Sequence, residues 1–327
     1  MCKNLKKLYD LIYKNYLYQT HTHKKLNKNI NHILNYSKFI HPKIKSNIDK
    51  NFNNIYYINS ENNHFWIVTN NKTINKKLIN QLVNRVNTMK KISKNKNDNN
   101  IYIWLTNEKK MLPKTGNTLN TLHVNSGLSY VYSPEVEKNG DIYIWRKEEL
   151  PKVLIHELLH SLRYDYYSQN DYLNNLIYQD FNVNHHVNVN ESYTETLATI
   201  LNCIFYTIEH DKDYEYFLAL LSNEIEHSNQ QVDKLLKHYG YHDISELSRG
   251  NSNKIFKQET GVFSYYILKA MVMNNLDNFM KFSMKNRLYY PKNGDKKYYT
   301  LLKKYYIDYK PEKIKNHTKT LKMTITQ

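Results

Sequence analysis

Three residues within a five-residue stretch have the types and the spacing needed to bind a metal ion and to activate water. His156 and His160 are four residues apart, and Glu157 directly follows the first histidine. On an α-helix, residues i and i+4 project from the same face one turn apart, so both imidazoles can reach one tetrahedral Zn²⁺ ion. Glu157 points about a third of a turn away, beside a water molecule on that ion. The pattern predicts zinc-assisted hydrolysis with Glu157 as the general base.

The surrounding residues predict a helix that enters a hydrophobic core. Pro151 suits the first turn of a helix, and Glu148 and Glu149 suit its N-terminal dipole. Most other positions in 153–162 are aliphatic. The alternative is a pair of core histidines without a metal. Because burying two imidazoles and a carboxylate on such a helix is costly without polar partners, the metal site is favoured.

A zinc site on this helix needs a third protein ligand. The extension found in metzincins requires glycine and histidine where this chain has Arg163 and Tyr166, so that pattern is excluded. The segment NESYTE instead places Glu191 after His160 by 191 − 160 = 31 residues. Glu195 follows one helical turn later, on the same face.

Alternatives to Glu191 remain open in the sequence. Glu195 could be the ligand in its place, with the two roles exchanged. Both glutamates could be first-turn acids that only stabilise the start of a helix. His185 and His186, in a polar loop, could supply a third imidazole.

The combination of HELLH and NESYTE resembles the gluzincin metallopeptidases, the thermolysin-like group, over residues of roughly 140 to 200. The resemblance implies a zincin-like α+β fold and one Zn²⁺ ion per chain, held by His156, His160 and Glu191. It also implies that Glu157 is the catalytic base. Glu195 would be the carboxylate that orients a ligand histidine. The family usually has aspartate at that position, and the glutamate in this chain reaches further.

Residues outside the motif could complete the site. Gluzincins use a tyrosine or histidine from the C-terminal half to stabilise the oxyanion, and Tyr265 is the candidate because a glycine-containing turn leads into an apolar helix. Arg146 and Arg163 could bind a substrate carboxylate or form structural ion pairs, Arg163 with Glu195. The strand 141–145 is the expected edge along which an extended peptide substrate would align.

Hydrophobic periodicity predicts an α+β chain in which strands precede the motif and helices follow it. The expected strands are 55–58, 65–68, 101–105, 122–131 and 141–145, and the expected helices are 74–89, 189–206, 214–227, 232–238 and 262–273. The predicted organisation is an N-terminal helical cap (1–50), an α+β zincin subdomain (51–165), a helical subdomain with the third ligand (166–286) and a basic tail rich in tyrosine and lysine (287–327).

Charge and composition restrict the partners. The 327 residues carry a formal net charge of +17, but the chain is also rich in Asn, Ile and Tyr and poor in Gly and Pro. An AT-rich coding sequence explains this composition, so the charge is weak evidence for a polyanion, and nucleic acid binding through the basic tail is a minor alternative. The expected partner is a protein or peptide substrate, and the sequence leaves the oligomeric state open.

The sequence favours an intracellular setting. Cys2 and Cys203 imply no disulfide framework, no apolar run is long enough for a membrane span, and residues 1–20 lack the apolar stretch of a signal peptide. We expect a cytoplasmic protein, or one packaged in a particle assembled in the cytoplasm. The rival function is a non-catalytic basic binding protein with a structural zinc ion or an inactive peptidase fold. The intact Glu157 argues against the inactive peptidase fold, because nothing structural requires that residue.

Overall fold

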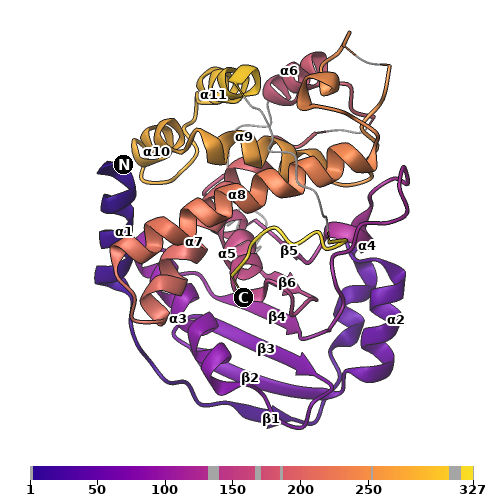
Figure 1. The fold of residues 1–327 in the computed structure, drawn as a ribbon. Coiled ribbons are helices and arrows are strands. Elements are labelled where there is room, and N and C mark those ends of the chain that lie inside the picture. Colours follow the sequence, from indigo (N-terminus) through magenta and orange to yellow (C-terminus); the bar gives the residue numbers. More distant parts are fainter. Residues whose placement is uncertain are drawn as a thin grey trace.

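The computed structural model describes residues 3–131, 140–165, 171–184, 187–251, 253–308 and 318–326, which form a mixed α+β fold (Figure 1). Over these residues the strands are β1 (Lys24–Leu26), β2 (Asn54–Ser60), β3 (Asn63–Thr69), β4 (Asn99–Trp104), β5 (Gly127–Ser129) and β6 (Ile142–Ile144). The α-helices are α1 (Lys3–Asn15), α2 (Pro42–Asn51), α3 (Lys76–Ser93), α4 (Thr121–Val124), α5 (Leu150–Ser161), α6 (Tyr172–Asp180), α7 (Asn190–Glu209), α8 (Tyr214–His238), α9 (Lys269–Asn274), α10 (Leu276–Met284) and α11 (Asp295–Asp308). Two 3₁₀-helices, η1 (Asn31–Tyr36) and η3 (Ile244–Leu247), and a π-helix, η4 (Phe263–Leu268), are also present. The α+β prediction is confirmed.

The strands form one sheet of order β1-β2-β3-β4-β6-β5. β2 and β3 pair antiparallel, with Ile58 opposite Phe65, and β3 and β4 pair parallel. A parallel pair needs a crossover connection, which α3 supplies. The Asn75 side chain caps this helix by accepting a hydrogen bond from the Leu78 N–H. The hairpin, the helix and β4 agree with the sequence prediction.

Two hydrophobic clusters cover the two faces of the sheet. On one face, Phe65, Ile101 and Ile144 belong to the main core, together with side chains of α3, α5 and α7. On the other face, Trp104 and Trp145 pack with side chains of η1 and α2. The two helices of the predicted N-terminal cap lie apart, because α1 packs against α7 while α2 packs with the sheet on the opposite side of the molecule (Figure 1).

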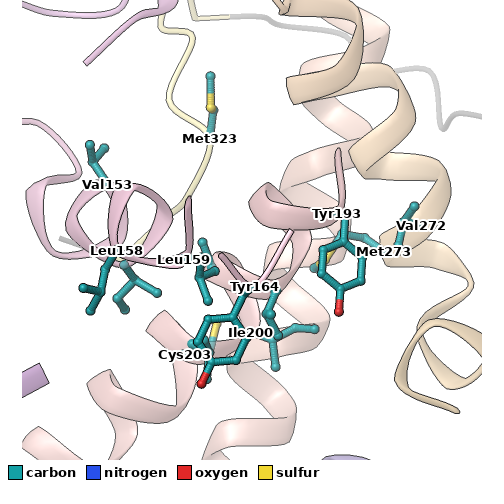
Figure 2. Close-up of a cluster of buried hydrophobic side chains, with 14 of the residues drawn as sticks. Val153, Leu158, Leu159, Tyr164, Tyr193, Ile200, Cys203, Val272, Met273 and Met323 are labelled. Carbon is teal, nitrogen blue, oxygen red and sulfur yellow. The ribbon is translucent and has the colours of Figure 1, made fainter. Parts of the chain in front are cut away.

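Two neighbouring interior helices, α5 and α7, carry the motif residues. α5 begins at Leu150 with proline in its first turn, as predicted. Leu158 and Leu159 of α5 lie in one buried cluster with Ile200 and Cys203 of α7 (Figure 2). Because these apolar side chains are closely packed, they fix the height and the rotation of one helix against the other. The polar residues between the helices are positioned by that packing.

The strands predicted at 122–131 and 141–145 are both present in part, as β5 and β6, but the extent of the first and the edge position of the second are wrong. Within 122–131, the first residues belong to the short helix α4, because the Asn120 side chain accepts a hydrogen bond from the Leu122 N–H and His123 completes a capping box. Only the three residues of β5 follow as a strand. β5 pairs with β6, so β6 lies between β4 and β5 and is not the edge that was expected at 141–145. The edge on this side of the sheet is β5.

The helical half differs from the prediction at two places. The helices predicted at 214–227 and 232–238 are one helix, α8, because no glycine or proline interrupts it and Ser228 and Gln231 are buried in it. The segment 318–326 is not a surface tail. Leu321 and Thr324 are completely buried, and the segment, yellow in Figure 1, runs through the middle of the molecule.

Candidate metal centre

Ligand atoms of three residues from α5 and α7 converge on one point. Nε2 of His156 and Nε2 of His160 are 3.0 Å apart, and Oε2 of Glu191 lies 3.3 Å from the first and 3.2 Å from the second. The structure thus brings together the three residues predicted as ligands, and these side chains could hold a metal ion. The alternative ligands His185 and His186 lie outside the described residues.

This donor set fits zinc. A tetrahedral ion with bonds of about 2.0–2.2 Å separates its ligand atoms by about 3.3–3.6 Å. The three distances between Nε2 and Oε2 atoms, 3.0, 3.2 and 3.3 Å, are close to that range. Two imidazoles and one carboxylate are also a ligand set of catalytic zinc sites, which keep a fourth position for water or substrate.

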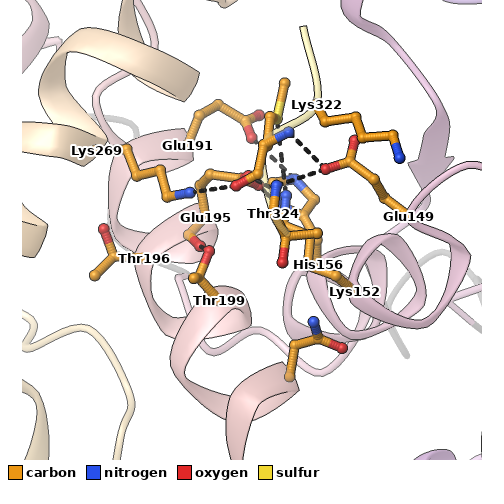
Figure 3. Close-up of polar contacts among 12 residues, drawn as sticks. Glu149, Lys152, His156, Glu191, Glu195, Thr196, Thr199, Lys269, Lys322 and Thr324 are labelled. Atoms are coloured by element: carbon orange, nitrogen blue, oxygen red, sulfur yellow. Dashed lines mark hydrogen bonds and ion pairs between the residues drawn. The ribbon is translucent and has the colours of Figure 1, made fainter. Parts of the chain in front are cut away.

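The other ring nitrogen of each histidine faces a carboxylate. Nδ1 of His156 lies 2.8 Å from Glu195 Oε2, and Nδ1 of His160 lies 2.6 Å from Asp165 Oδ2. A carboxylate at this place favours the tautomer with a proton on Nδ1, which leaves the lone pair of Nε2 for a metal. Glu195 is also paired with Lys152 of α5 (Figure 3). It therefore has the position of an orienting carboxylate and not that of a ligand.

The carboxylates around the two imidazoles stabilise positive charge between them. Burial lowers the pKa of His160, but Asp165 and Glu191 together raise it well above its usual range. Burial also lowers the pKa of His156, and Glu191 and Glu195 outweigh that effect and raise it. For Glu191, burial raises the pKa, but the two histidines hold it well below its usual range. A divalent cation could replace the protons as the source of this positive charge.

Glu157 is buried beside the ligand histidines. Its Oε2 accepts a hydrogen bond of 3.0 Å from Ser129 Oγ of β5. Gly127 of the same strand lies so close that an added Cβ would be 2.7 Å from Glu157 Oε1, so a side chain there would displace the carboxylate. Burial raises the pKa of Glu157. A carboxyl group with a pKa shifted toward neutrality is suited to accepting and returning a proton.

Tyr265 lies on the π-helix η4 and contacts the same region. Its ring centroid is 6.2 Å from that of His156. Gly261 leaves room for the ring, because an added Cβ would lie 3.2 Å from Tyr265 Cζ. Tyr265, His156 and Glu157 line a cavity of about 40 Å³, which is large enough for a water molecule. The structure therefore places the predicted oxyanion donor beside the predicted base.

The two arginines predicted to bind substrate do not line this cavity. Arg146 is completely buried and donates to backbone carbonyls of the residues just before β5. α5 ends at Ser161, and Arg163 follows with a left-handed backbone conformation (φ 61°), so Arg163 is not on the expected helical face. Glu195 is paired with Lys152 in its place. These positions support structural roles for both arginines and not substrate binding.

Sequence reasoning missed three contacts of the centre, those of Asp165 with His160, Ser129 with Glu157 and Lys152 with Glu195. Lys152 lies four residues before His156 and therefore on the same helical face, which a helical projection shows. Asp165 follows the end of α5 closely, and an acid near a last-turn histidine is a usable signal. Ser129 has no such signal, because its contact depends on how the sheet packs against α5.

Comparisons with known proteins give one informative match. The chain is similar to an uncharacterized protein of Acanthamoeba polyphaga mimivirus, with 27% identity over 172 residues. The aligned part covers 50% of this chain and 44% of the viral protein, so the chain spans less than half of that protein. No protein-family model and no solved structure matches the chain.

Within the part of the chain that the structure describes, no helix combines the length and the apolar character needed to cross a membrane.

Proposed function

We propose that this protein is a zinc-dependent metallopeptidase of gluzincin type, with a zincin-like arrangement of sheet and active-site helix. One observation carries the proposal: Nε2 of His156, Nε2 of His160 and Oε2 of Glu191 lie 3.0–3.3 Å apart, and Glu157 is adjacent on the same helix. The carboxylates beside Nδ1 of both histidines support the proposal, because they favour a proton on Nδ1 and leave Nε2 of each ring for a metal.

A zinc ion held by these three ligands would supply Lewis acidity, which lowers the pKa of a water molecule and polarises a peptide carbonyl. Glu157 takes a proton from the attacking water and returns it to the leaving amine. The Ser129 hydroxyl holds one oxygen of this carboxylate in place. Tyr265 donates a hydrogen bond to the developing oxyanion. Burial raises the pKa of Tyr265 well above its usual range, so its hydroxyl keeps the proton that it must donate.

The open edge of β5 offers a backbone site for an extended peptide substrate. Among the residues that the structure describes, β5 pairs with β6 and with no strand on its other side, and Ser129 and Gly127 lie against Glu157. A peptide that adds to this edge as a further strand would pass beside the base, aligned by backbone hydrogen bonds that do not depend on its side chains. We propose β5 in place of 141–145 as the substrate-binding edge.

The full chain, purified and loaded with zinc, tests the proposal. We expect one zinc ion per chain by metal analysis and cleavage of peptides from a mixed peptide library. The Glu157→Gln variant should keep its zinc but lose about 10²- to 10⁴-fold in kcat/KM, because only the general base is removed. Glu215→Gln changes an exposed glutamate on α8 and is the matched control, with activity equal to that of the wild type.

Two outcomes would contradict the proposal. One is unchanged metal content in His156→Ala, which removes a ligand. The other is undiminished cleavage by Glu157→Gln. A chain that holds zinc but cleaves no peptide would favour the non-catalytic alternative, in which the ion is structural. We further propose that the protein acts in the cytoplasm or in a particle assembled there, and the similarity to a viral protein fits such a particle.

A further inference from the structure

A wide groove lies between α10 and α11, on the opposite side of α8 and α9 from the sheet (Figure 1). Its volume is about 700 Å³, and residues 291–294 of the connection between the two helices also line it. The walls are helices of 9 and 14 residues, which at 1.5 Å per residue are about 13 and 21 Å long. The groove can therefore hold two to three turns of another helix.

Every charged residue that lines this groove is a lysine: Lys281, Lys285, Lys292, Lys297 and Lys304. All five are exposed, and none is paired with an acid among the residues that the structure describes. Three other surface grooves of the molecule contain both signs of charge, with Glu108, Asp180 and Asp213 among their lining residues. The general excess of lysine in this chain therefore does not account for the purely positive lining.

The floor of the groove is apolar and already formed. Phe282 of α10 and Leu301 of α11 line it. The Phe282 ring is fixed by Tyr290 and Tyr298, whose ring centroids each lie 5.6 Å away. Gly294 is required there, because an added Cβ would lie 2.9 Å from Phe282 Cζ. A fixed apolar floor between two helices suits a ligand with an apolar face.

We infer that this groove binds an acidic amphipathic helix of a partner protein. The apolar face of such a helix would cover Phe282 and Leu301, and its carboxylates would meet the lysines of the rim. A second copy of this chain, with a net charge of +17, would be repelled. Nucleic acid would neutralise the lysines, but its phosphate backbone has no apolar face for the floor. The site is separate from the metal centre and does not depend on the proposed peptidase activity.

Fluorescence anisotropy with the full chain tests the inference. The probe is a labelled peptide of the length of α11, with leucines on one helical face and glutamates on the other. A second peptide has the same composition in an order that breaks the apolar face. We expect the amphipathic peptide to bind at least about tenfold more tightly than the scrambled one, since only the former can cover the floor.

Variants separate the charge of the groove from its shape. Reversal of three rim lysines (Lys281→Glu, Lys285→Glu and Lys297→Glu together) should weaken binding of the amphipathic peptide at least about tenfold. Thr300→Trp, at an exposed position inside the groove, fills it without changing charge and should weaken binding to a similar extent. The matched control reverses three exposed lysines elsewhere and should change affinity less than about twofold: Lys7→Glu, Lys24→Glu and Lys25→Glu.

Several results would overturn the inference. Equal losses in both triple variants would mean that only net charge matters. Unchanged binding by Thr300→Trp, or equal binding of the scrambled peptide, would exclude the groove as a shaped site. Duplex DNA or phosphatidylserine vesicles that bind more tightly than the peptide, with the same dependence on the groove lysines, would assign the site to a different partner. Circular dichroism of each variant shows whether a loss reflects misfolding.

Discussion

The charged side chains around α5 form two neighbouring groups that are built in different ways. In the first group, Lys110 pairs with Glu149 at 2.8 Å. Lys152 pairs with Glu195 (Figure 3). These four side chains are at most 2% exposed, and their charges cancel. Glu149 also accepts two backbone hydrogen bonds from the segment 318–326. This ion-pair cluster therefore joins the start of α5 to the buried C-terminal segment.

The second group lies around the proposed ligands and has no such balance, although Glu195 of the first group also contacts His156. Glu157, Asp165 and Glu191 contribute three carboxylates, and no lysine or arginine pairs with them in the part of the chain that is described. The side chains of the three proposed ligands are 10–16% exposed, so an ion can reach them from solvent. Similar buried carboxylates thus give stability where lysines neutralise them, and under our proposal they bind a cation where lysines are missing.

The largest change in stability is expected in the ion-pair cluster. Lys110→Met should lower the free energy of unfolding by about 3–5 kcal/mol, because it leaves the buried charge of Glu149 without its partner. The double variant Lys110→Met/Glu149→Gln should recover part of this loss, since it removes both charges. Urea denaturation in the presence of a chelator measures both. If the single variant loses less than about 1 kcal/mol of unfolding free energy, the Lys110–Glu149 pair does not stabilise the start of α5.

Tyr265→Phe should lower kcat about 10²- to 10³-fold, because it removes one donor to the oxyanion. Zinc content and the free energy of unfolding should hardly change. Tyr266→Phe is the matched control on the neighbouring residue, whose hydroxyl donates to the Leu321 carbonyl at 2.6 Å, away from the metal ligands. It should reduce stability and leave kcat near the wild-type value. Equal kcat losses in the two variants would remove the oxyanion role of Tyr265.

Asp165→Asn should weaken zinc binding about 10- to 100-fold, because the negative charge that fixes the tautomer of His160 and makes it a stronger ligand is lost. Competition with a chromophoric chelator measures the affinity. Asp180→Asn, whose carboxylate accepts from Tyr299 and lines a groove that contains none of the proposed ligands, serves as the control and should bind zinc normally. An unaltered zinc affinity in Asp165→Asn would show that the packing of α5 alone orients this ring.

The pH dependence of zinc binding tests the protonation of the two ligand histidines. Zinc needs neutral imidazoles, and the neighbouring carboxylates raise the pKa of His156 and His160 in the metal-free centre. Zinc affinity should therefore be highest and independent of the protonation of these histidines above the raised pKa values. As the pH decreases through them, the affinity should fall by about tenfold per pH unit for each proton displaced. In Asp165→Asn the fall should begin at a lower pH. The same chelator competition, repeated at several pH values, measures both profiles. Identical profiles for the wild type and Asp165→Asn would contradict this account.

Local signals explain which features could be predicted from the sequence. The spacing of His156, Glu157 and His160 needs only helical geometry, as does the position of Glu195 one turn after Glu191. The β2–β3 hairpin and α3 follow from periodicity between neighbouring segments. The errors have local causes too, such as the capping box at Asn120 inside an expected strand and the end of α5 before Arg163.

The sequence by itself determined which helices carry the proposed ligands and on which helical faces those residues lie. Only the tertiary structure decided that β5 and not β6 forms the edge beside Glu157 and that Ser129 reaches its carboxylate. It also decided that Lys110 and Lys152 neutralise Glu149 and Glu195, while no described lysine pairs with Glu157, Asp165 or Glu191. These contacts join residues far apart in the chain, so they depend on how closely packed elements align, and periodicity within one element carries no information about that alignment.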